Sequence, residues 1–155
     1  RKPVKPWAWL DTAPVARLSV ARLGESAVVL GDTTGQGLAF GPTELPSPRG
    51  SNVTVLAAHR DTHFAFIQDI RPGDEVTLQR IDGTLARYRV SHLTTVRKDG
   101  FAVPRDPPRP LLALATCYPF GLTAAQTPLR RIAWAELVEV QRNSASTAPP
   151  PIPRA

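Results

Sequence analysis

The sequence predicts a mainly β domain, a barrel or sandwich of seven or eight short strands with long loops and little helix. Seventeen prolines and ten glycines in 155 residues argue against a helix bundle, because both residue types destabilise helix interiors. Short apolar or alternating segments recur between turn signals, which is the pattern of strands. Apolar residues at 42% and charged residues at 21% are typical of a folded soluble domain. No apolar run reaches the ~18 residues of a membrane span.

In the first half, residues 15–22 alternate between apolar and polar and 26–30 form an apolar run, so both predict strands. Glycine and proline predict loops at 31–37 and 41–51, on either side of 38–40. Residues 52–58 (NVTVLAA) are β-branched and apolar and predict a buried strand. Residues 64–70 predict a short helix that ends at Arg71-Pro72-Gly73.

In the second half, residues 75–81 and 84–96 predict a hairpin around Asp82-Gly83, a dipeptide that favours the positive φ of tight turns. Four prolines in 97–110 predict a long loop. Residues 111–116 (LLALAT) predict a central strand covered on both faces. A loop over 118–128 leads to 131–140, where Ile132, Trp134, Val138 and Val140 favour strand over helix.

The two ends differ from the rest in composition. Residues 1–6 are basic and proline-interrupted, which predicts a flexible leader, and 143–155 (NSASTAPPPIPRA) predict a disordered tail. The folded domain is then 7–142. The chain begins Arg1-Lys2-Pro3 and contains no methionine, so we expect that a native N-terminal signal or anchor has been removed.

The net charge of +6 comes from 19 basic and 13 acidic residues. The basic residues are scattered and are not interleaved with aromatic residues, so no nucleic-acid partner is expected. Solubility accounts for the charge, and attraction to an anionic membrane surface stays open.

Cys117 is the single cysteine, which excludes an intrachain disulfide and a cysteine-based zinc site. It stands where the apolar run 111–116 stops and a loop begins, a common place for a functional group. A lone cysteine with histidines elsewhere is the pattern of a thiol nucleophile. The alternative is an inert core thiol.

Three histidines could assist such a thiol. His59 closes the strand 52–58, the same setting as Cys117, so two parallel neighbouring strands would bring both to one rim. The alternative is a polar residue that merely ends the strand. His63 is four residues further on, but no third ligand for a metal is evident. His92 falls within the hairpin, and we interpret it as structural or surface.

Arg130 and Arg131 begin the last predicted strand. If that strand is the antiparallel neighbour of 111–116, one of the two lies beside Cys117. A guanidinium there could stabilise negative charge developing on a carbonyl oxygen. The alternative is a pair of solvated charges at a strand end.

Four segments together resemble the sortases, cysteine transpeptidases of bacterial cell envelopes, over about 7–140. They are LAFGP (38–42), NVTVLAAHRDTHFAFIQDIRPGDEV (52–76), LALATCYPFG (112–121) and PLRRIAWAEL (128–137). The details are most similar to the sortases of Gram-negative bacteria and to the class D type. Ala58 departs from the glycine that usually precedes the catalytic histidine.

The resemblance implies a closed β-barrel of about eight strands. It implies His59 as the catalytic histidine, Cys117 as the nucleophile and Arg130 as the catalytic arginine, since the family's arginine follows Pro128 by two residues. Thr116 fills the position of the family's threonine before cysteine. The loop 97–110 corresponds to a loop that binds the sorting motif, which makes Phe101 and Val103 candidate substrate contacts; packing on the barrel is the alternative.

The resemblance further implies a Leu-Pro-x-Thr-Gly-like motif near the C-terminus of a substrate protein, and an amine that accepts the acyl group. No cofactor and no metal site are implied. An inner-membrane anchor would hold the domain on the extracytoplasmic side of the envelope. A thiol hydrolase with the same cysteine and histidine, and a non-catalytic β-barrel binding module, are the alternative functions.

Overall fold

A computed structural model describes residues 12–32, 43–45, 51–58, 65–97, 100–118 and 129–142. The predictions for the leader 1–6, for 38–40 and for the tail 143–155 lie outside these residues. The described elements are β1 (Thr12–Val20), β2 (Glu25–Asp32), β3 (Thr43–Glu44), β4 (Val53–Ala58), the 3₁₀ helix η2 (Ala65–Asp69), β5 (Glu75–Arg80), β6 (Leu85–Arg97), β7 (Leu111–Tyr118) and β8 (Leu129–Gln141).

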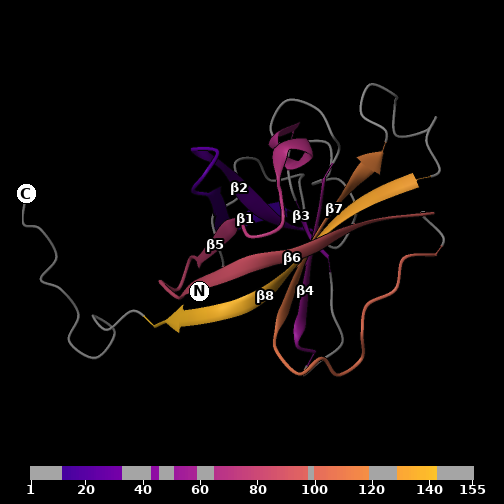
Figure 1. The fold of residues 1–155 in the computed structure, drawn as a ribbon. Coiled ribbons are helices and arrows are strands. Elements are labelled where there is room, and N and C mark those ends of the chain that lie inside the picture. Colours follow the sequence, from indigo (N-terminus) through magenta and orange to yellow (C-terminus); the bar gives the residue numbers. More distant parts are fainter. Residues whose placement is uncertain are drawn as a thin grey trace, which may run out of the picture.

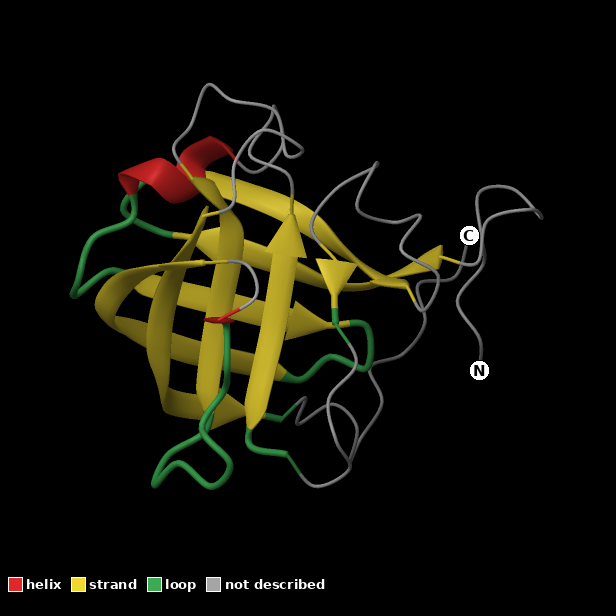
Figure 2. Ribbon diagram, turned by 90° about the vertical axis from the view of Figure 1, so that its right-hand side faces the viewer, coloured by secondary structure: helices red, strands yellow, loops and turns green. Residues whose placement is uncertain are grey.

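The eight strands close into a barrel in the order β1-β2-β3-β4-β7-β8-β6-β5. Figure 2 shows the strands wrapping around a common interior, with η2 at one end. Closure satisfies strand edges that an open sheet would leave unpaired. The prediction of a closed barrel with about eight strands is confirmed, and the sandwich alternative is wrong.

Two apolar clusters cover the two faces of the central strands. The barrel interior is filled by side chains from seven strands and η2, among them Leu18, Leu56, Val76, Leu112 and Leu114. A second cluster lies on the outer face of the strands, which we call the outer cluster: Val53 and Val55 of β4, Ala113 and Ala115 of β7, and Ile132 of β8. Alternate residues of β7 thus enter opposite clusters, as expected for a strand covered on both faces.

The β5–β6 hairpin forms where Asp82-Gly83 predicts it. Gly83 has a φ of +92°, and it is the residue of the pair that takes a positive φ. Asp82 instead accepts a hydrogen bond from the backbone N–H of Thr84 at 2.8 Å, and this bond lowers the pKa of the Asp82 carboxyl. The turn therefore needs one glycine and one capping carboxylate, which differs from an Asp-Gly pair with both residues at positive φ.

Most predicted element types agree with the structure, and the differences are at the ends. β1 ends at Val20, before Arg22, and β7 continues through Tyr118, past the predicted end at 116. β3 is a two-residue strand inside the region predicted as loop; Thr43 pairs with Leu30 of β2 and Ala57 of β4. A two-residue strand forms only by pairing with its neighbouring strands. It is too short for its residues to show the alternation of apolar and polar positions that predicts a strand.

Candidate active site

The strand that precedes His59 and the strand that contains Cys117 are parallel neighbours. β4 and β7 pair without interruption from Val53 opposite Leu111 to Ala58 opposite Thr116. Figure 1 shows β4 close to β7, and β7 lies between β4 and β8 in the barrel. Ala58 and Thr116 are the residues just before His59 and Cys117, so the parallel arrangement expected from the sequence is confirmed up to that point. His59 and His63 themselves lie outside the described residues.

Cys117 lies opposite Arg130 in the antiparallel pair of β7 and β8. Thr116 is opposite Arg131, and Tyr118 is opposite Leu129. Directly opposed residues of an antiparallel pair share one face of the sheet, with Cα atoms ~4.5–5.5 Å apart. The register therefore gives positions 117 and 130 a common face and gives position 131 the opposite face.

The two arginines make different contacts. Arg130 is half-buried, and its Nη1 donates to the carbonyl oxygen of Leu129 at 2.9 Å. Arg131 donates from Nη1 to Thr95 Oγ1 of β6, also at 2.9 Å. The bond to Thr95 ties Arg131 to the strand on the far side of β8 from β7.

The residues that adjoin Cys117 and Arg130 on the same face of β7 and β8 are apolar. Ala113 and Ala115 precede Cys117 on this face of β7, and Ile132 and Trp134 follow Arg130 on β8. Phe101 and Val103, the two loop residues predicted to contact substrate, pack against this outer cluster. The structure thus brings both next to the strands of the candidate site.

Thr116 is the buried polar residue beneath the rim. It is 1% exposed, and it alternates with Leu112 and Leu114, which belong to the barrel interior. Within the part of the chain that is described, its Oγ1 has no hydrogen-bond partner. A buried hydroxyl without a partner costs on the order of 1–3 kcal/mol.

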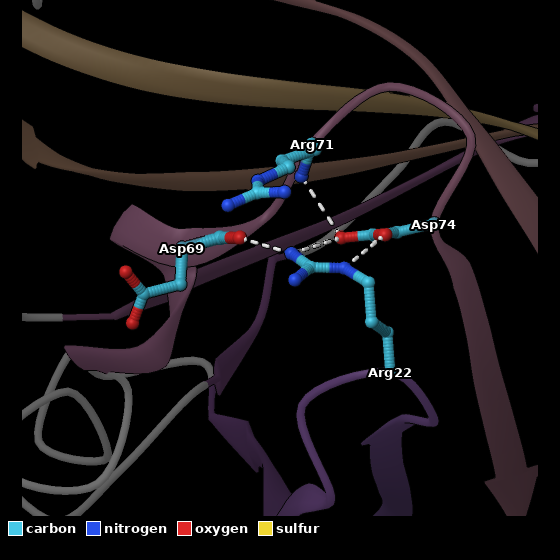
Figure 3. Close-up of polar contacts among 4 residues, drawn as sticks. All are labelled: Arg22, Asp69, Arg71 and Asp74. Atoms are coloured by element: carbon cyan, nitrogen blue, oxygen red, sulfur yellow. Dashed lines mark hydrogen bonds and ion pairs between the residues drawn. The ribbon is translucent and has the colours of Figure 1, made fainter.

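An ion pair anchors the connection between η2 and β5. Figure 3 shows Arg22, from the β1–β2 turn, reaching Asp74 at the start of β5. Arg22 Nε donates to Asp74 Oδ1 at 2.7 Å, and its Nη2 donates to Oδ2 at 3.0 Å and to the Asp69 carbonyl. The Arg71 N–H also donates to Asp74 Oδ2, at 2.9 Å. No local pattern predicts the role of Arg22, because it is 52 residues away from Asp74 in the chain.

Both carboxylate oxygens of Asp74 accept hydrogen bonds in this ion pair. The side chain is 6% exposed, and the hydrogen bond from Arg22 lowers the pKa of its carboxyl, as does the bond from the Arg71 N–H. Burial acts in the opposite direction but is outweighed. The end of η2 and the β1–β2 turn are therefore joined through one ionised carboxylate.

A cavity of about 790 Å³ opens beside the outer cluster, between β6, β8 and the loop before β7. Val96, Val103, Leu111 and Trp134 line its apolar part. Sequence reasoning missed this cavity, because its walls come from three segments that only the fold brings together.

Among the described residues, no three His, Cys, Asp or Glu side chains gather as a metal site would require. No helix in the same residues is long and apolar enough to cross a membrane.

Comparison with known proteins relates most of the described barrel to one family. A sequence model of the sortase domain matches residues 18–138. Sortase A from Listeria monocytogenes is 21% identical, with a TM-score of 0.72 over 86% of this chain and 92% of that one. The catalytic domain of SrtD from B. anthracis is 24% identical, with a TM-score of 0.68 over 92% of this chain and 97% of that one. No curated protein matches the chain.

The family match spans β1 to β8 and includes both the cysteine strand and the arginine strand. The structural matches show the same fold at low identity, with sortase C from Streptococcus pneumoniae as a further example: 20% identity and a TM-score of 0.69 over 81% of this chain and 69% of that one. The chain therefore belongs to the sortase family of cell-envelope cysteine transpeptidases.

Proposed function

We propose that Cys117, His59 and Arg130 form the catalytic site of this sortase. The observation that carries the proposal is the paired register: Ala58 opposite Thr116 on one side of β7, and Arg130 opposite Cys117 on the other. His59 directly follows Ala58 in the chain. The three residues are 13 to 71 positions apart in the sequence, and the register supports their meeting at the end of β4 and β7 and the start of β8.

The substrate is a polypeptide with a Leu-Pro-x-Thr-Gly-like motif. The thiolate sulfur of Cys117 attacks the threonine carbonyl carbon, the C–N bond to glycine breaks, and protonated His59 gives its proton to the departing amine. Arg130 stabilises the negative charge on the carbonyl oxygen. The product of this half-reaction is a thioester on Cys117.

The second half-reaction restores the enzyme. An acceptor amine attacks the thioester carbon, its proton passes to His59, and the C–S bond breaks to give a new amide and a thiolate. Water in place of the amine gives a carboxylic acid. The balance between ligation and hydrolysis therefore depends on which nucleophile reaches the thioester first.

The outer cluster offers an apolar surface on which the substrate's sorting motif can lie. An extended peptide with its scissile bond at the rim can lie along the apolar face of β7 and β8, towards Phe101 and Val103. These two side chains would contact the leucine and proline of the motif. Thr116 is buried directly beneath the rim and would support the site from the barrel side.

The proposal also covers the bounds of the catalytic domain, its location in the cell and its partners. The catalytic domain spans residues 7–142, with 1–6 as a leader and 143–155 as a tail. An N-terminal anchor would hold it at the inner membrane of a Gram-negative envelope, facing the extracytoplasmic side. Its partners are a protein with a C-terminal sorting motif and an amine acceptor.

The test is mass spectrometry of the protein incubated with a Leu-Pro-x-Thr-Gly peptide library and hydroxylamine. We expect hydroxamates that end at the threonine, which identify the motif and the cleavage point together. The same incubation without hydroxylamine gives the hydrolysis background. Absence of hydroxamate products, or equal product from Cys117→Ala, would refute the proposal.

A further inference from the structure

The lining of the cavity beside the outer cluster includes five polar residues that the proposed chemistry does not use. They are Ser91 and His92 of β6, Asp106 and Arg109 of the loop, and Glu136 of β8, and we call them the polar half of the lining. All five of these side chains are exposed. A lining of this kind selects for a ligand with both an apolar stem and a polar end.

A bulge in β6 brings two of these polar residues into the lining. Val90 pairs with Ala135 and His92 pairs with Trp134, so Ser91 is an extra residue without a partner of its own. Both Ser91 and His92 therefore line the cavity, whereas neighbouring residues of a regular strand point to opposite faces. Bulges of this kind redirect side chains and are frequent next to functional sites.

The bulge also fixes the His92 ring. Ser91 Oγ is 2.9 Å from His92 Nδ1 and 3.2 Å from the carbonyl oxygen of Trp134. A hydroxyl has one proton, so both contacts are hydrogen bonds only when Ser91 donates to Trp134 and His92 Nδ1–H donates to Ser91. The neutral ring then keeps its lone pair on Nε2. The ring stacks on Trp134, with centroids 6.3 Å apart and planes at 14°.

The polar half is thus rich in hydrogen-bond acceptors. His92 Nε2 and the carboxylates of Asp106 and Glu136 all accept, and in the described part of the chain neither carboxylate has an ion-pair or hydrogen-bond partner. Trp134 Nε1–H is already donated to Thr94 Oγ1 at 3.0 Å. Arg109 supplies the single cation among the residues that line this half.

The distance from Arg130 to the cavity follows from the rise per residue along β8. Trp134 is four residues and Glu136 six residues along β8 from Arg130, which corresponds to about 13 and 20 Å in a strand. An extended substrate has nearly the same rise per residue. A substrate residue five to seven positions from the scissile bond therefore reaches the polar half.

We propose that the polar half of this cavity binds a lysine or arginine side chain of the substrate, five to seven residues from the cleaved bond. An ammonium or guanidinium group is a donor without acceptors, which complements three acceptors, and its aliphatic stem can pack on Trp134. The proposal rests on the proposed function for the position of the cleaved bond. It assigns to Glu136 a role in substrate selection outside the motif itself.

The test uses motif peptides extended on either side, with lysine, acetyl-lysine or alanine placed five to seven residues from the cleaved bond. Acetyl-lysine keeps the length of the side chain and removes its charge. We expect the lysine peptide on one side to have a kcat/KM about two- to fivefold above the other two, the range of a solvent-accessible ion pair. Glu136→Gln should reduce this ratio to about one, and Glu136→Lys should instead favour a further peptide that has glutamate at the same position. Glu25→Gln, at an exposed site on β2, is the matched control and should leave the ratio unchanged.

Binding of the same peptides to Cys117→Ala separates this inference from the proposed function. Cleavage without a lysine preference, or a preference that survives in Glu136→Gln, overturns the inference and leaves the catalytic proposal intact. A lysine preference in binding that depends on Glu136, without cleavage of any peptide by the wild-type protein, supports the cavity assignment and overturns the catalytic one. Equal binding of all peptides overturns the inference directly.

Discussion

Cys117 on β7 lies directly opposite Arg130 on β8, in a register that runs without a bulge from Leu111 opposite Glu136 to Tyr118 opposite Leu129. Eight consecutive residue pairs hold this alignment. A slip by one residue would bring Arg131 opposite Cys117 and would turn the apolar face of β8 over. The register is thus set by the burial of Ile132 in the outer cluster and of Ala133 in the barrel interior. This packing is independent of the catalytic chemistry.

Replacement of Cys117 by alanine should abolish peptide cleavage and ligation, with a fall of at least about 10³-fold, because the acyl group then has no sulfur to bind. Alkylation with iodoacetamide should inactivate the wild-type protein and add one adduct by mass spectrometry. A Cys117→Ala variant with wild-type stability and undiminished cleavage would contradict a thiol mechanism.

Arg130→Ala should lower kcat/KM by about 10²–10³-fold, the usual loss when a group that stabilises an oxyanion is removed. Arg131→Ala is the matched control, since it removes the same charge from the adjacent position on the other face of β8 and loses the hydrogen bond to Thr95. We expect a loss of less than about fivefold for Arg131→Ala. Similar losses in both variants would assign the effect to net charge or strand stability.

Activity should follow a bell-shaped pH profile, because the mechanism needs a cysteine thiolate together with a protonated histidine. Free cysteine and histidine titrate near pH 8.5 and 6.5, so midway between them each active form is only about 10% populated and about 1% of molecules hold both. Slow turnover is expected for the same reason. A flat profile of kcat/KM between pH 5 and 10 would exclude these roles for Cys117 and His59.

Asp74 should make the fold acid-sensitive. Its pKa is lowered in the folded state by the hydrogen bond from Arg22, so its contribution to stability is complete above the unfolded pKa of about 3.9. The contribution is lost as the pH falls from there through the folded pKa. Asp74→Asn should be less stable than wild type by about 2 kcal/mol at pH 7.

The difference in unfolding free energy between the wild-type protein and Asp74→Asn should therefore depend on pH. Urea unfolding at several pH values should show the difference in unfolding free energy narrowing below pH 4. Asp82→Asn tests a second carboxyl, whose pKa is also lowered by hydrogen bonds from Thr84. Its effect should be smaller, because this carboxyl is exposed in a hairpin turn and has no arginine partner like Arg22 among the residues that the structure describes. A constant difference for Asp74→Asn at all pH values would mean that its carboxylate is not ionised in the folded state.

Local patterns in the sequence determined the type of most elements. The alternation of 15–22, the apolar runs 52–58 and 111–116, and Asp82-Gly83 each predict what they form, because a period of two and a positive φ are properties of a few neighbouring residues. The same patterns marked His59, Cys117 and Arg130 as polar residues at strand ends. They did not predict β3, which forms only because β2 and β4 lie on either side of it.

Only the tertiary structure decided which strands are neighbours and in which register. The parallel pairing of β4 with β7, the choice of Arg130 over Arg131 as the residue opposite Cys117, and the Ser91 bulge that shapes the cavity all follow from burial of side chains on both faces of the barrel. Contacts between residues tens of positions apart have no periodic signature in the chain. Their energy depends on packing against partners that the sequence does not place side by side.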